Sequence, residues 1–375
     1  FPVLSPPRLP ALNHKRPAGT PVPARSPAVA QPPTCAPAAG PLLAGAFALA
    51  ALAMAPAHAD AVPDSLAARG AHGEQFAQAA DPARRPRVAA GTLAVLYPDI
   101  GEPYRKVFTE ILEGIEDQAQ SRVHGYPVAA SADPAELQAA LKNSGCRVVI
   151  ALGRQGLKTA SGLDLPLGMV VGGVSSVPEA DKLNGISLTP DPALLFSHLK
   201  GLMPGVRRVI VVYNPQTNES LIRLARETAR AQGLELLTLE ATDLAGAVRR
   251  YEAALASADG RRDAFWLPPD PLTVDEAVIM PMVLRESWNR NIAIFSSSIL
   301  HVRKGALFAL YPNNFELGRD LATLALARLN GDTARRGVAP LRAVRTALNT
   351  RSASHMGLNI STSQQRSFDA IFPEP

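Results

Sequence analysis

The chain of 375 residues has few cysteines and few aromatic residues, and it lacks an apolar run long enough to cross a membrane. Aromatic side chains make up 5% of it, and its two cysteines are Cys35 and Cys146. Cys146 opens the run CRVVIAL, where we expect a small buried side chain, so no disulfide framework is predicted. The apolar stretch Leu42–Met54 is too short to span the hydrocarbon core as a helix.

Acidic residues are missing before Asp60, whereas basic residues such as Lys15 and Arg16 precede the apolar stretch. That stretch closes on Ala57-His58-Ala59, a small-x-small pattern typical of a signal-peptide cleavage site. We therefore expect residues 1–59 to be a proline-rich leader and cleaved signal peptide, with export to the periplasm. Residues 60–87 have no hydrophobic periodicity and predict a flexible tether.

The excess of basic residues belongs to this leader. Four of the 38 basic residues and none of the 33 acidic ones lie before Asp60, which leaves 34 basic and 33 acidic side chains beyond it. A net charge so close to zero gives no electrostatic footprint for nucleic acid. The 316 residues that follow the leader are enough for two lobes with separate cores.

Common catalytic motifs are also absent beyond the leader, including GxGxxG, GxxxxGK[ST], HExxH, GxSxG and paired CxxC. Ser197 and Lys200 fit SxxK, but they lie among leucines within a predicted helix. Asp263, Asp270 and Asp275 lie at predicted strand or helix ends, where capping explains them. The histidines show no metal-ligand spacing. We therefore expect no enzyme, no metal site and no cofactor.

One structural unit is present twice. The segments TLAVLYPDIGEPYRKVFTEILEGIEDQA from Thr92 and RVIVVYNPQTNESLIRLARETARAQG from Arg208 each pass from an apolar strand through a polar turn into an amphipathic helix. Strands that are apolar on both faces are typical of parallel sheets covered by helices. Such sheets bind ligands at the carboxyl ends of their strands. The duplication therefore predicts two lobes that face a shared cleft.

Strand and helix patterns alternate along the rest of the chain, which predicts an α/β protein with two Rossmann-like lobes and parallel sheets. We expect both tryptophans, Trp266 and Trp288, in the core. The predicted strands are 92–97, 126–129, 147–152, 167–171, 208–213, 234–239, 264–267, 292–295 and 344–349. Between them, the predicted helices are 134–142, 155–160, 193–202, 244–256 and 315–330.

Residues 264–332 resemble a known family. AFWLPPDPLTVDEAV, followed by NIAIFSSSILHVRKGALFALYPNNFELGRDLATLALARLNGD, is similar to the closing part of ABC-transporter substrate-binding proteins of the tryptophan/tyrosine type. The likeness extends over residues 88–357 and is strongest in the second half. It implies the type I periplasmic-binding-protein fold, with crossing strands between lobe 1 (88–189 and 312–335) and lobe 2 (190–311 and 336–375).

The resemblance places a ligand on loops that follow strands, where polar side chains and free helix N–H groups can meet it. The implied ligand-binding residues are Tyr104, Arg154, Gln155, Ser175, Asn214, Asp270, Ser297, Ser298 and Asn313.

This sequence departs from the family pattern in one direction. Ser175, Ser298 and Asn313 stand at or near positions where the family usually has acidic residues, and a carboxylate is the natural partner of an amino acid's ammonium group. We therefore expect common amino acids to bind weakly, unless Asp270 faces the cleft. Arg154 either favours an anionic or neutral polar ligand or points to solvent.

Two functions fit this pattern. The first is an exported solute-binding protein, a monomer that delivers a small-molecule ligand to an inner-membrane ABC permease. The second is a periplasmic sensory module that presents its ligand to a receptor kinase. The sequence does not separate them.

Overall fold

The computed structural model describes residues 92–102, 104–129, 133–175, 182–332 and 336–374. The predicted leader and signal peptide (1–59) and the tether (60–87) lie outside the described residues. Within the described ranges, no helix combines the length and the apolar character needed to cross a membrane.

The first sheet contains six parallel strands in the order β11-β5-β4-β3-β1-β2. They are β1 (Leu93–Pro98), β2 (His124–Val128), β3 (Val148–Leu152), β4 (Gly168–Gly172), β5 (Asn184–Pro190) and β11 (Gly337–Leu341). All five residues of β3 and the first four of β1 are buried, as expected for central strands covered on both faces. The parallel arrangement predicted from the duplicated unit is confirmed in this lobe.

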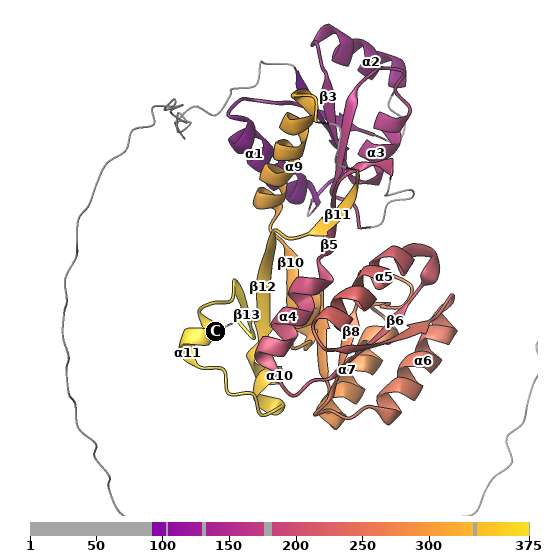
Figure 1. The fold of residues 1–375 in the computed structure, drawn as a ribbon, viewed down its shortest axis with the longest axis vertical. Helices are drawn as coiled ribbons and strands as arrows, with labels where there is room; N and C mark the ends of the chain where they lie inside the picture. The colour runs from indigo at the N-terminus through magenta and orange to yellow at the C-terminus, as the bar shows by residue number, and fades with distance from the viewer. Residues whose placement is uncertain (1–91, 103, 130–132, 176–181, 333–335, 375) are drawn as a thin grey trace, which may run out of the picture. The chain divides into compact units, whose positions relative to one another are not determined.

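Helices cover both faces of the first sheet. α1 (Tyr104–Ala119) and α9 (Asn314–Leu329) pack side by side on one face, while α2 (Pro134–Asn143) and α3 (Gly153–Ser161) cover the other (Figure 1). The backbones of α1 and α9 approach closely because Gly114 and Gly318 lie between them. A Cβ atom at Gly318 would collide with the carbonyl oxygen of Ile111.

The second sheet contains seven strands in the order β13-β12-β10-β9-β8-β6-β7. They are β6 (Arg208–Tyr213), β7 (Glu235–Glu240), β8 (Asp263–Leu267), β9 (Ala293–Ser296), β10 (Phe308–Pro312), β12 (Val344–Asn349) and β13 (Ala370–Phe372). Neighbouring strands are parallel except for β10 and β12. β10 leaves this sheet toward the first one and β12 returns from it, so the two run in opposite directions. The predicted parallel sheet is therefore confirmed apart from this pair.

Helices also cover both faces of the second sheet. α4 (Pro192–Leu202) and α5 (Pro215–Ala231) pack on one face together with α10 (Thr350–His355), and α6 (Leu244–Ser257) and α7 (Ile279–Arg290) pack on the other. Two short helices, α8 (Ile299–Lys304) and α11 (Thr362–Gln365), follow β9 and precede β13.

The two tryptophans of the chain differ in burial. Trp266 is fully buried, and the ring of Phe196 meets it edge-on at 5.7 Å between centroids. Trp288, at the end of α7, is 39% exposed. The expectation that both lie in the core is therefore wrong for Trp288.

Three segments connect the sheets, after β5, after β10 and between β11 and β12. Hydrogen bonds tie the first and the third of them together: the N–H of Asp191 donates to the carbonyl of Leu341 (2.8 Å), and the Arg342 guanidinium donates to the Asp191 carboxylate (2.6 Å). The predicted boundary at residue 336 assigned β11 to lobe 2. Because β11 pairs with β5, it belongs to the first sheet, and the chain crosses only after Leu341.

Candidate functional site

The residues predicted to bind a ligand in the second lobe follow four neighbouring strands. Asn214 comes directly after β6, Asp270 follows β8, Ser297 and Ser298 follow β9, and Asn313 follows β10. These strands are parallel and adjacent in the order β10-β9-β8-β6, so their carboxyl ends form one edge of the sheet. The structure therefore brings these five residues to the same edge.

Asp270 is 3% exposed, and its carboxylate accepts four hydrogen bonds. One oxygen accepts from the N–H of Asn214 (2.7 Å) and the side-chain amide of Asn218 (2.9 Å). The other accepts from the N–H groups of Leu272 (3.0 Å) and Thr273 (3.3 Å). Charge-assisted hydrogen bonds of this kind stabilise a buried carboxylate, and Asp270 forms no ion pair with a described residue. Asp270 thus ties the start of α5 to the turn that follows β8.

Two asparagines begin helices at this edge. Asn214 is 7% exposed, and its side-chain oxygen accepts from the N–H of Gln216 (3.0 Å), which caps α5. Asn313 caps α9 in the same way through the N–H of Glu316 (3.4 Å). In both residues the side-chain NH₂ group donates to no other described residue. Each amide can therefore hold its helix with the oxygen and offer its N–H groups to a ligand.

A chain of hydrogen bonds that the sequence did not reveal lies at the end of β9. Ser296 Oγ and His301 Nδ1 are 2.6 Å apart, and His301 Nε2 lies 3.0 Å from Glu276 Oε1. Lys304 pairs with the same glutamate. Burial lowers the pKa of His301, although the hydrogen bond to Glu276 opposes this shift. The hydrogen bond from Lys304 lowers the pKa of Glu276.

This order of serine, histidine and carboxylate resembles the catalytic triad of a hydrolase. Unlike the serine of such a triad, however, Ser296 is not accessible to a substrate. Ser296 is fully buried, so a substrate does not reach its Oγ. The hydrogen bonds instead fasten α8 and Glu276 to the end of β9. No signal in the sequence identifies them, because Glu276 lies 25 residues from His301 and the spacing matches no motif.

The two predicted serines after β9 differ in their contacts. The Ser297 hydroxyl is buried and has no hydrogen-bond partner among the residues that the structure describes. Ser298 precedes α8 without capping it through its side chain, while its N–H donates to Ser296 Oγ (3.2 Å). A buried hydroxyl without a partner costs free energy, so Ser297 is suited to a hydrogen bond with a bound molecule.

The predicted residues of the first lobe also follow neighbouring strands, β1, β3 and β4. Tyr104 begins α1 and is 64% exposed. Arg154 and Ser175 are exposed, and Arg154 makes no ion pair with any residue that the structure describes. Gly153 permits this arrangement, because its φ of +69° turns the chain sharply from β3 into α3.

Gln155 is more constrained than its neighbours. Its side-chain amide donates to the carbonyl of Ala129 (3.3 Å) and lies 3.5 Å from the Thr159 hydroxyl. These contacts tie α3 to the end of β2. Gln155 is therefore the predicted first-lobe residue whose side chain is most engaged within the protein.

Comparisons with known proteins agree with this architecture. The family model described as ABC transporter substrate binding protein matches residues 183–365. A comparison of the sequence with curated protein sequences finds no match. A Streptococcus pneumonia ABC domain in complex with L-Trp is 16% identical, covering 76% of this chain and 99% of its own, with a TM-score of 0.50. A ligand-free, open substrate-binding protein with adhesive properties from Clostridium difficile is 17% identical with the same coverage and a TM-score of 0.54.

At these identities the structural neighbours establish the fold, and the family match is a separate finding about the sequence. Both agree with the resemblance drawn from residues 264–332. The chain therefore matches the ABC transporter substrate-binding protein family over residues 183–365 and has the type I periplasmic-binding-protein fold.

Proposed function

We propose that this protein is an exported solute-binding protein, which captures a small polar ligand between its two lobes and delivers it to an ABC importer in the inner membrane. The observation that supports this most is the placement of polar loops at the carboxyl ends of neighbouring strands in both sheets, within a chain that matches the substrate-binding family. Ligands bind at this position in open α/β sheets. The export step rests on the signal pattern that ends at Ala59.

The second-lobe residues favour a ligand without an ammonium group. Asn214, Ser297, Ser298 and Asn313 are neutral, and the Asp270 carboxylate is engaged by four donors of the protein itself. We propose that Asp270 acts by positioning Asn214 and Asn218 rather than by contacting the ligand. A desolvated cation would then lack a counter-charge on this side of the site.

The first lobe supplies a positive charge instead. Arg154 lies at the turn from β3 into α3 and has no carboxylate partner among the described residues. A guanidinium recognises carboxylate and phosphate groups through paired hydrogen bonds. The proposed ligand is therefore a neutral or anionic polar molecule.

Isothermal titration calorimetry tests the ligand class. We expect the twenty common amino acids to bind more weakly than small carboxylates of similar size, and Arg154→Ala to weaken carboxylate binding by about ten- to a hundredfold. Arg223→Ala, an exposed position on α5, is the matched control. Micromolar binding of an amino acid that Asp270→Asn abolishes without loss of stability would show that this carboxylate contacts the ligand and would overturn the proposal.

A further inference from the structure

A second pocket lies in the second lobe, at the end of the sheet opposite the proposed ligand loops. It has a volume of about 410 Å³, and it is bounded by Ile292 just before β9, Leu307 just before β10 and Asn349 at the end of the antiparallel β12. The ligand loops follow the other ends of β9 and β10. Strands of this length separate their ends by roughly 15 Å. The pocket is therefore distinct from the site between the lobes.

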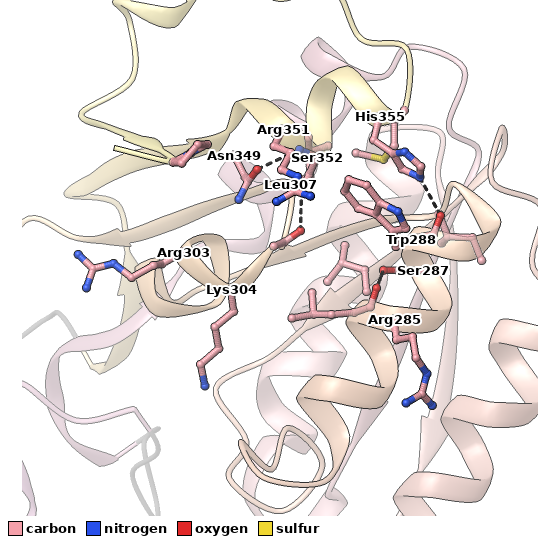
Figure 2. Close-up of a pocket in the computed structure, with 16 residues that line it drawn as sticks. Arg285, Ser287, Trp288, Arg303, Lys304, Leu307, Asn349, Arg351, Ser352 and His355 are labelled. Carbon is pink, nitrogen blue, oxygen red and sulfur yellow. Dashed lines mark hydrogen bonds between the residues drawn. The ribbon is translucent and has the colours of Figure 1, made fainter. Parts of the chain in front are cut away.

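The floor of this pocket is apolar and its side wall is aromatic. Ile292, Ile294 and Leu307 form the floor and are almost fully buried. The rings of Trp288 and His355 stack with centroids 3.6 Å apart and planes inclined by 6° (Figure 2). His355 Nε2 also hydrogen-bonds the carbonyl oxygen of Trp288 (2.9 Å). This pairing holds α7 and α10 together, so the wall exists before any ligand arrives.

The charged side chains that line the pocket are all cationic. They are Arg285, Arg303, Lys304 and Arg351, and no aspartate or glutamate is among the lining residues. Arg285, Arg303 and Lys304 form ion pairs with glutamates that lie outside the pocket and are partly or largely exposed. These are Glu286, Glu374 and Glu276. Arg351 makes no ion pair with a described residue, and its guanidinium lies 5.6 Å from the centre of the Trp288 ring. Figure 2 shows the aromatic pair on one side of the pocket and Arg303 and Lys304 on the other.

The amide and hydroxyl side chains that line the pocket make hydrogen bonds within the protein. Asn349 accepts from the N–H of Ser352 (2.9 Å) and donates to the carbonyl of Val302 (2.9 Å). The Ser352 hydroxyl donates to the carbonyl of Gly305 (2.8 Å). Because these amide and hydroxyl groups are engaged, we expect the cations and the apolar surface to contribute most to the recognition of a ligand here.

We propose that this pocket is a second binding site, which takes an organic carboxylate with an apolar tail or ring. The carboxylate meets Arg351, where no carboxylate of the described residues competes for it, and the apolar part lies against Trp288 and the apolar floor. A volume of this size suits a small molecule. The site goes beyond the proposed transport function and does not depend on which solute binds between the lobes.

Octanoate is the probe, and Trp288 is the reporter. The chain has two tryptophans and Trp266 is fully buried in the core, so a change in emission on adding octanoate arises at Trp288 and disappears in Trp288→Phe. We expect saturable binding, with a dissociation constant that rises about ten- to a hundredfold in Arg351→Gln. 1-Octanol and octylamine, which lack the negative charge, should bind more weakly by a similar factor. Added salt should weaken the binding of octanoate but not that of 1-octanol.

Two control variants locate the site. Arg223→Gln removes an exposed arginine from α5, and Arg328→Gln removes one from a basic hollow in the first lobe that also contains Lys142 and Arg147. Both should bind octanoate as the unchanged protein does. Absence of saturable binding at millimolar octanoate, equal binding of 1-octanol, or a loss in Arg328→Gln instead of Arg351→Gln would each overturn the proposal. Because the salt series uses the unchanged protein, it decides the role of charge even if Arg351→Gln is unstable.

Discussion

Replacement of Asp270 by asparagine separates a carboxylate that holds the fold from one that contacts the ligand. In Asp270→Asn one carboxylate oxygen becomes an NH₂ group, which cannot accept a hydrogen bond. Each oxygen of Asp270 accepts two hydrogen bonds, so two of the four are lost whichever oxygen is replaced. Hydrogen bonds to charged groups contribute about 1.5–3 kcal/mol each, so we expect the free energy of unfolding to fall by about 3–6 kcal/mol.

Urea unfolding followed by circular dichroism measures this loss. Asp243→Asn is the matched control, because Asp243 caps α6 at the surface and asparagine caps a helix equally well. That variant should change the free energy of unfolding by less than about 0.5 kcal/mol. In the double variant with Asn218→Ala, the free energy of unfolding should fall by less than the sum of the two single losses, because Asn218→Ala removes a hydrogen bond that Asp270→Asn already removes or weakens. A loss below about 1 kcal/mol in Asp270→Asn would refute the structural role.

Three further predictions follow from packing, titration and export. Gly318→Ala should destabilise the protein, because the new Cβ meets the backbone of α1. Gly201 has open space around it, so Gly201→Ala should stabilise the protein by about 0.5–1 kcal/mol. Thermal unfolding measures both effects. Burial lowers the pKa of His198 below its ordinary value of 6.5. As the pH falls through 6.5, this histidine is therefore protonated in the unfolded chain before it is protonated in the folded protein, and the free energy of unfolding decreases. His198→Phe should reduce that decrease. N-terminal sequencing of the exported protein should find cleavage after Ala59, and a terminus upstream of Leu42 would contradict the assigned signal.

The sequence predicts the central elements well because their patterns are local. Strands such as β3 and β6 are continuous apolar runs, and α2, α4 and α6 each follow an aspartate (Asp133, Asp191 and Asp243) whose side chain accepts a hydrogen bond from a first-turn N–H group. β10 and β13 are absent from the predicted strands, and so are β5 and β11, because NGISLTP and GVAPL mix polar, glycine and proline residues. β5 and β11 lie about 150 residues apart in the chain, so only the fold itself brings them together.

In the candidate site, too, local features can be predicted from the sequence and contacts between distant residues cannot. Position after a strand predicts which residues reach the carboxyl edge, as for Asn214 and Asn313. It does not predict which side chains are already engaged, because that depends on distant partners: Asp270 meets Asn214 and Asn218 more than 50 residues away. Likewise, Trp288 is exposed because it lies at the end of α7 beside α10, a helix that no sequence pattern paired with it.

The most direct test of a ligand held between two lobes is native mass spectrometry of the protein purified from the cells that produce it. We expect one small molecule per chain, which is lost in Arg154→Ala from the first lobe and also in Asn214→Ala from the second, but retained in the control Arg223→Ala. Loss in both single variants would show that the molecule depends on both lobes at once. A bound molecule that survives both substitutions, or none at all in the unchanged protein, would contradict the account.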